Sequence, residues 1–106
     1  MDFKTLASNL GLDEEDFAEL VEIFIATSYN DIGKISLGLE KNNGEAVAQA
    51  AHSIKGAAGN LGFADLSSLA KDIEMSAKQD DFNDLTGKAD KINTMLKTIE
   101  GFINTD

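Results

Sequence analysis

Apolar residues recur at alternating steps of three and four along the last quarter of the chain, and this spacing restricts the possible folds more than any other feature. The series is Phe82, Leu85, Ala89, Ile92, Leu96, Ile99 and Ile103. Such steps place every member on one face of an α-helix. The same face would suit a coiled coil, but further amphipathic segments upstream favour packing within one chain. We therefore predict an all-α fold.

Capping residues and glycines divide the rest of the sequence into four further helices. In order, the five predicted helices cover residues 2–10, 13–41, 42–60, 64–79 and, after a cap at Asp80 or Asp81, a segment that reaches Ile103. No segment combines apolar and polar alternation with β-branched enrichment, so strands are not expected. Four long helices with short connections predict an antiparallel up-down-up-down four-helix bundle, with residues 2–10 as a short extra N-terminal helix at one end.

Two of these helix starts depend on N-cap signals. Asp13 is followed by three acidic residues, which suit the positive end of a helix dipole. Asn42, with Glu45 three residues later, resembles a capping box and predicts the start of the third helix. Gly62 is the predicted exit of that helix.

Length, charge and composition limit the class of protein. A chain of 106 residues supports a single domain over residues 1–106. The formal net charge of −10 and the absence of arginine disfavour contact with nucleic acid or an anionic membrane. The longest uncharged runs have nine residues, whereas a membrane span needs roughly 20. Without cysteine or an export signal, the chain is expected to be a cytoplasmic monomer that binds neither nucleic acid nor membrane.

One stretch of the third predicted helix departs from ordinary helix composition. Residues 46–62 read AVAQAAHSIKGAAGNLG and contain the only histidine of the chain, His52. A glycine inside a helix costs about 1 kcal/mol relative to alanine, so Gly56 and Gly59 need a reason. At about 100° per residue, the face toward the bundle consists of Val47, Ala50, Ala51, Ile54, Ala58 and Leu61. His52 lies outside that face, and Ala48, Gly56 and Gly59 leave the surface around it without bulky side chains.

Each of these residues also has an ordinary interpretation. A lone histidine is more often a solvated or half-buried side chain than a functional one, and small residues allow helices to pack closely. Close packing does not explain Gly56, because it lies opposite the apolar face. In the next helix, Lys71, Glu74 and Lys78 share one face and could meet the His52 side. The residues therefore predict a surface prepared for a large partner.

The stretch His52 to Gly62, HSIKGAAGNLG, resembles the signature of histidine-containing phosphotransfer (HPt) domains, the carriers of multistep phosphorelays. The resemblance implies that His52 is the phosphoacceptor, Lys55 the neighbouring cation and Gly56 the small position that lets a receiver domain approach. In the next helix it assigns the imidazole's hydrogen-bonding partner to Glu74 and a basic position to Lys78. Many standalone members carry glutamine at the position of Glu74, whereas chemotaxis-type kinases carry glutamate.

The chemistry suits a carrier without turnover of its own. A neutral imidazole can attack phosphorus through Nε2, while a hydrogen bond to Glu74 would hold the tautomer and Lys55 and Lys78 would offset phosphoryl charge. The sequence offers no metal site or cofactor site of its own, so Mg²⁺ is expected in the partner. The resemblance implies a response-regulator receiver domain and a sensor histidine kinase as partners, with Ala48, Gly56 and Gly59 at the docking surface.

Two alternatives stay open at this point. The chain could be the N-terminal phosphoacceptor domain of a chemotaxis-type histidine kinase, in which an attached catalytic domain phosphorylates the same histidine. It could also be a helical adaptor that binds a partner through the His52 face without chemistry. Residues alone do not identify the kinase, the receiver, the direction of phosphate flow, the output pathway, the organism, or whether the chain is a standalone protein.

Overall fold

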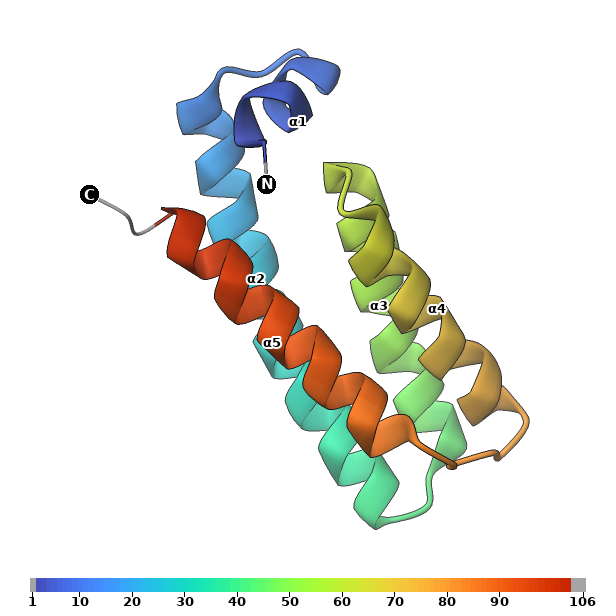
Figure 1. Ribbon diagram of the computed structural model, residues 1–106. Coiled ribbons are helices and arrows are strands. Elements are labelled where there is room, and N and C mark those ends of the chain that lie inside the picture. Colours follow the sequence, from blue (N-terminus) through green and yellow to red (C-terminus); the bar gives the residue numbers. More distant parts are fainter. Residues whose placement is uncertain (1, 104–106) are drawn as a thin grey trace.

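The structure, a computed structural model, describes residues 2–103 and contains five helices and no strand within that range (Figure 1). The helices are α1 (Phe3–Asn9), α2 (Glu14–Glu40), α3 (Gly44–Leu61), α4 (Ala64–Lys78) and α5 (Leu85–Ile103). The four long helices run alternately up and down, and each of them packs against two others. The predicted all-α, antiparallel four-helix bundle is confirmed.

One apolar face of each long helix supplies the core. The face predicted for the third helix is buried at every position, from Val47 to Leu61. In α5 the periodic series is buried from Leu85 to Ile99. In α4 the buried face includes Leu66, Ala70 and Ile73, while Leu69 is half-buried. The helical period therefore identified the core faces of α3 and α5.

The short extra N-terminal helix lies at the end of the bundle where α2 begins, as predicted (Figure 1). Asp2 caps α1 through a 3.1 Å hydrogen bond from the backbone N–H of Thr5. The ring of Phe3 packs edge-on against Phe17, with ring centroids 5.5 Å apart, and also contacts Phe63. Aromatic contacts thus attach a helix that is too short to be stable alone.

The predicted capping box at the start of the third helix is wrong by one residue. Asn43, not Asn42, is the N-cap of α3, and its side chain accepts a hydrogen bond from the N–H of Ala46 at 3.1 Å. Asn42 has a φ of 52° and forms the turn out of α2, a conformation that asparagine tolerates better than most residues. At the other end, Gly62 ends the helix with a φ of 90°, as expected for a left-handed C-cap.

The last helix begins later than predicted, at Leu85 instead of directly after Asp80 or Asp81. Asp80 and Asp84 both have positive φ values, 55° and 61°, which break the helical path. The side chain of Asp81 instead accepts a hydrogen bond from the N–H of Asn83 within the connection. Phe82 still packs against the core from this turn. The first residue of the apolar series therefore lies in the connection before α5 and not in the helix.

Candidate functional site

His52 lies near the middle of α3 and points away from the core. Its side chain is 65% exposed, although its neighbours Ala51 and Ile54 are fully buried. The expected position outside the core face is therefore observed. An exposed imidazole on a rigid helix is accessible to a reagent or a partner from outside the bundle.

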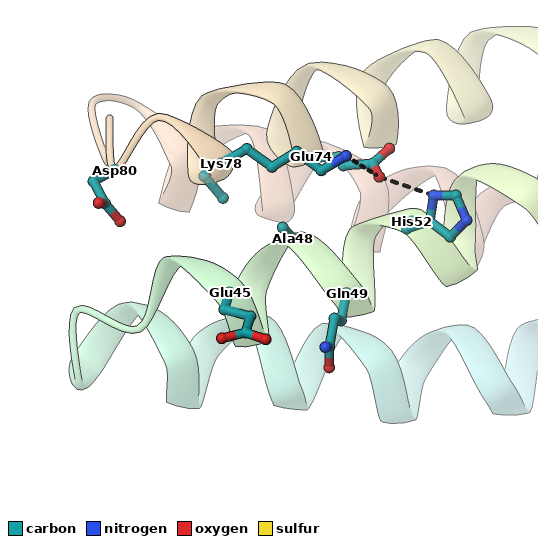
Figure 2. Close-up of a pocket in the computed structure, with 8 residues that line it drawn as sticks. Glu45, Ala48, Gln49, His52, Glu74, Lys78 and Asp80 are labelled. Atoms are coloured by element: carbon teal, nitrogen blue, oxygen red, sulfur yellow. Dashed lines mark hydrogen bonds and ion pairs between the residues drawn. The ribbon is translucent and has the colours of Figure 1, made fainter.

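The carboxylate of Glu74, on α4, is the centre of the site. Glu74 is only 4% exposed, and three side chains converge on it. His52 Nδ1 lies 2.8 Å from Oε2, Lys55 Nζ lies 2.9 Å from Oε1, and Lys78 Nζ lies 3.3 Å from Oε2. These contacts join α3 to α4 (Figure 2), because two of the three partners come from the other helix. A buried carboxylate is stable only with partners of this kind.

These partners also control the ionisation of Glu74. Burial by itself raises the pKa of the carboxyl group, but hydrogen bonds from Lys55, His52 and Lys78 outweigh that effect and lower it from 4.5 to about 2. Glu74 is therefore ionised throughout the physiological range. As an ionised group it only accepts hydrogen bonds, so Nδ1 of His52 must carry the proton between them.

This protonation assigns the reactive atom. With Nδ1–H donating to Glu74, the other ring nitrogen of a neutral imidazole, Nε2, holds the free lone pair. Figure 2 shows that this nitrogen is directed away from Glu74. Nε2 of His52 thus faces outward as the nucleophile, and the hydrogen bond from Nδ1 to Glu74 fixes the orientation of the ring.

Not every residue of the predicted constellation takes part. Lys71 shares the spacing of Glu74 and Lys78 on α4 but forms no ion pair with any residue in the range 2–103. Ser67, which the sequence did not single out, donates a 2.9 Å hydrogen bond to the carbonyl oxygen of Lys55. This bond fixes α4 against the turn of α3 that follows His52. No sequence signal indicates Ser67, because its role depends on how the two helices are aligned.

The three expected docking positions have different surroundings. Gly56 is exposed, and a Cβ atom placed there would meet nothing within 4 Å. At Gly59 a Cβ atom would lie 3.4 Å from Ser67 Oγ, so this glycine faces α4. Ala48 is 6% exposed and lies with His52 along a groove of about 650 Å³ between α3 and α4. Of the three positions, only Gly56 is exposed and also has free space where a side chain would begin.

The described residues contain no cluster of three or more side chains able to hold a metal ion. Within the same range no helix combines the length and hydropathy needed to cross a bilayer.

Comparison with known proteins points to one family. The model of the Hpt domain matches residues 19–102, which include all four long helices except the first five residues of α2 and the last residue of α5. Among solved structures, the histidine-containing phosphotransfer protein B (HptB) from Pseudomonas aeruginosa PAO1 has the same fold, with a TM-score of 0.85 and 21% sequence identity over 99% of this chain and 91% of that one. No curated protein matches significantly. Hpt domains are histidine phosphotransfer carriers of phosphorelays, and this chain belongs to their family.

Proposed function

We propose that His52 Nε2 is the atom that carries the phosphoryl group, which it exchanges with an aspartate of a receiver domain. The observation that carries this proposal is the 2.8 Å contact between Nδ1 of an exposed imidazole and the buried, ionised carboxylate of Glu74. This is the only histidine in the sequence. Its ring is held in one tautomer with its nucleophilic nitrogen facing outward.

The transfer step requires no separate base. The lone pair of Nε2 attacks phosphorus, an N–P bond forms, and the bond between phosphorus and the aspartyl oxygen breaks to release the aspartate carboxylate. The positive charge that develops on the imidazole is stabilised by Glu74 through the Nδ1–H bond. When the phosphoryl group returns to a receiver, the N–P bond breaks and the bond between phosphorus and the aspartyl oxygen forms again.

Lys55 and Lys78 would balance the charge of the arriving phosphoryl group. Both ammonium groups are within 3.3 Å of the Glu74 carboxylate, and both side chains retain exposed surface beside His52. Long lysine side chains can turn from one anion to another by rotation about single bonds. Each lysine can therefore pair with Glu74 in the free state and with a phosphoryl oxygen during transfer.

Other parts of the reaction would come from the partner. Mg²⁺ bound to the acidic pocket of the receiver domain would neutralise the oxygens of the transferred group, and a sensor histidine kinase would be the original source of phosphate. On this view the chain exchanges phosphoryl groups in the cytoplasm as a monomer and has no catalytic turnover by itself.

A second candidate function has one observation in its favour. Position 74 holds a glutamate, which is typical of the N-terminal phosphoacceptor domain of chemotaxis-type kinases, whereas many standalone carriers have glutamine. In that case the same Nε2 would receive phosphate from ATP through an attached kinase domain. The adaptor without chemistry has less support, because docking alone does not require the contact between His52 and Glu74.

Phosphotransfer from a panel of radiolabelled, phosphorylated receiver domains tests the proposal. We expect label on the native chain that is lost in acid and stable in base, as for a phosphoramidate, and no label on a His52→Gln variant. Acid-stable label, or label that survives His52→Gln, would contradict the assignment. Efficient labelling by a chemotaxis-type kinase domain, without transfer from any receiver, would favour the second candidate.

A further inference from the structure

A second buried carboxylate lies on the other side of α3 and is not used by the phosphotransfer site. Asp31, in the middle of α2, is 5% exposed. It forms no hydrogen bond or ion pair with any residue in the range 2–103, and its Oδ2 atom is completely buried. A carboxylate oxygen removed from water without a partner is costly. Such a group in a native fold calls for an explanation.

Asp31 lines a groove between α2 and α3 that lies beside the phosphotransfer site. The groove has a volume of about 370 Å³, and Gln49 and Ser53 line it from α3 together with Ala46 and Ala50. Gln49 also lines the groove that contains His52, and Ser53 directly follows His52 in the sequence. The two grooves therefore adjoin at Gln49, so a protein that docks over His52 can extend to the groove of Asp31.

The lysines of this chain do not neutralise Asp31. Lys34 and Lys41 lie along the same groove, and Lys34 is at a spacing of three residues, which often allows pairing on a helix. Neither ammonium group comes within ion-pair distance of the Asp31 carboxylate. Both side chains extend from α2 and its C-cap, where solvent can hydrate their charge. The carboxylate is thus left for a donor from outside the chain.

The surroundings of Asp31 favour a cationic donor. The chain that precedes Asp31 is acidic, because residues 5–33 contain seven acidic residues and no lysine or arginine, whereas the two lysines along the groove, Lys34 and Lys41, follow Asp31 in the sequence. Leu37, which is 50% exposed, lines the same groove as Asp31. Apolar surface beside a recessed carboxylate suits a long side chain with an apolar stem and a charged end.

We propose that the groove at Asp31 accepts one lysine or arginine side chain of the partner receiver domain, whose N–H groups donate to the Asp31 carboxylate during docking at His52. This inference rests on the proposed function and extends it from the phosphoryl group to partner selection. A receiver without a cation at this position would leave the buried carboxylate unpaired on docking, which penalises the wrong partner.

The first test uses the free protein and needs no phosphate. Backbone amide shifts of Gln49 and Ser53 are followed by NMR while methylguanidinium chloride is added as a stand-in for the end of an arginine. We expect saturable shifts that are absent with tetramethylammonium chloride, which has the charge but no N–H donor. Asp31→Asn should weaken the response at least tenfold, whereas Asp72→Asn, an exposed carboxylate on α4 that lines neither groove, should leave it unchanged.

The second test uses a receiver domain that exchanges phosphate with the native chain. Asp31→Asn should weaken binding of that receiver at least tenfold at low salt, and a double-mutant cycle should couple Asp31 to one lysine or arginine of the receiver. Labelling of His52 by phosphoramidate, a small donor that needs no docking, should be unaffected.

Several results would overturn the inference. They are non-saturable shifts, an equal response in Asp31→Asn, equal effects of both ammonium compounds, or unchanged receiver binding. An NMR response that rises strongly on Lys34→Ala would assign Asp31 to Lys34 of the same chain instead. If the native chain responds to methylguanidinium but takes no phosphate from any receiver, the proposed function is refuted while the cation site at Asp31 is not.

Discussion

Glu74 and Asp31 are two carboxylates with almost equal burial and opposite surroundings. Glu74 is 4% exposed and Asp31 5%, and each lies against α3 from a different neighbouring helix. Glu74 receives His52, Lys55 and Lys78 within 3.3 Å. Asp31 has no such partner among the described residues. Burial alone therefore does not tell whether an acidic side chain holds the fold together or is kept for another molecule.

The difference has a simple physical origin. The donors around Glu74 keep the pKa of its carboxyl group at about 2 in spite of burial, so the charge is already compensated before any partner arrives. Around Asp31 the nearby lysines stay in solvent, and compensation has to come from elsewhere. We expect substitutions at the two carboxylates to affect stability with opposite signs.

The largest effect should come from Glu74, as a function of pH. Its pKa is lower in the folded state, about 2, than the ordinary 4.5, so its contribution to stability is complete above pH 4.5 and is lost as the pH falls toward 2. That contribution is on the order of 3 kcal/mol. The free energy of unfolding of the native chain minus that of Glu74→Gln should fall with decreasing pH in this window. A difference that does not change with pH would mean that the lysines do not stabilise the ionised carboxylate.

The opposite sign is expected for Asp31→Asn. Replacing the unpaired carboxyl group by an amide of the same shape should raise the free energy of unfolding by about 1 kcal/mol. Urea unfolding followed by circular dichroism measures this value. A loss of stability comparable to that of Glu74→Gln would show that Asp31 has a partner in solution and that the two carboxylates are alike.

Gly56 tests the exposed surface of α3 one turn beyond His52. Because a Cβ atom there meets nothing, Gly56→Ala should stabilise α3 by about 0.5 to 1 kcal/mol. Larger side chains should slow transfer from a receiver increasingly, in the order alanine, glutamine and leucine, while the melting temperature holds or rises. Gly59→Leu is the matched control, since it is directed at Ser67 and should lower stability first. If Gly56→Leu transfers at the native rate, the docking surface is elsewhere.

The smallest stability effects should come from the two lysines at Glu74. Each single alanine substitution leaves the other lysine in place, and both side chains are partly exposed, so a change of less than about 0.5 kcal/mol is expected for either. Phosphotransfer at subsaturating receiver should nevertheless slow in Lys55→Ala and Lys78→Ala. An unchanged rate in either variant would remove that lysine from the transfer site, and a large loss of stability would show that the pairs are not redundant.

Much of the fold could be predicted from the sequence because helix formation depends on residues close together in the chain. The period of apolar residues identified the buried faces of α3 and α5, and the glycine at position 62 identified the end of α3. The errors occurred at connections, where the period carries no information. Asn42 and Asp84 adopt left-handed conformations that depend on how the chain must turn between two packed helices.

The candidate site could be predicted in part for the same reason. The angular position of His52 on its helix predicted that it lies outside the core. The angular position of Gly56 on the same helix predicted that the surface beside His52 carries no bulky side chain. Lys71 was grouped with Glu74 and Lys78 by spacing, but spacing on α4 does not show which of these side chains faces α3. Ser67 and the orientation of Gly59 toward it depend on the same relation between helices.

The sequence by itself determined which segments are helical, which face of each is apolar and which nucleophile stands outside the core, because these properties repeat with the period of a single helix. Only the tertiary structure decided that Lys55 of α3 and Lys78 of α4 share one carboxylate with His52, and that Asp31 has no partner among residues 2–103. The physical reason is that pairing between charges depends on distances of a few ångströms across helix interfaces. Those distances are set by the rotation and axial shift of one helix against another. The periodic pattern within a single helix does not specify that rotation or shift.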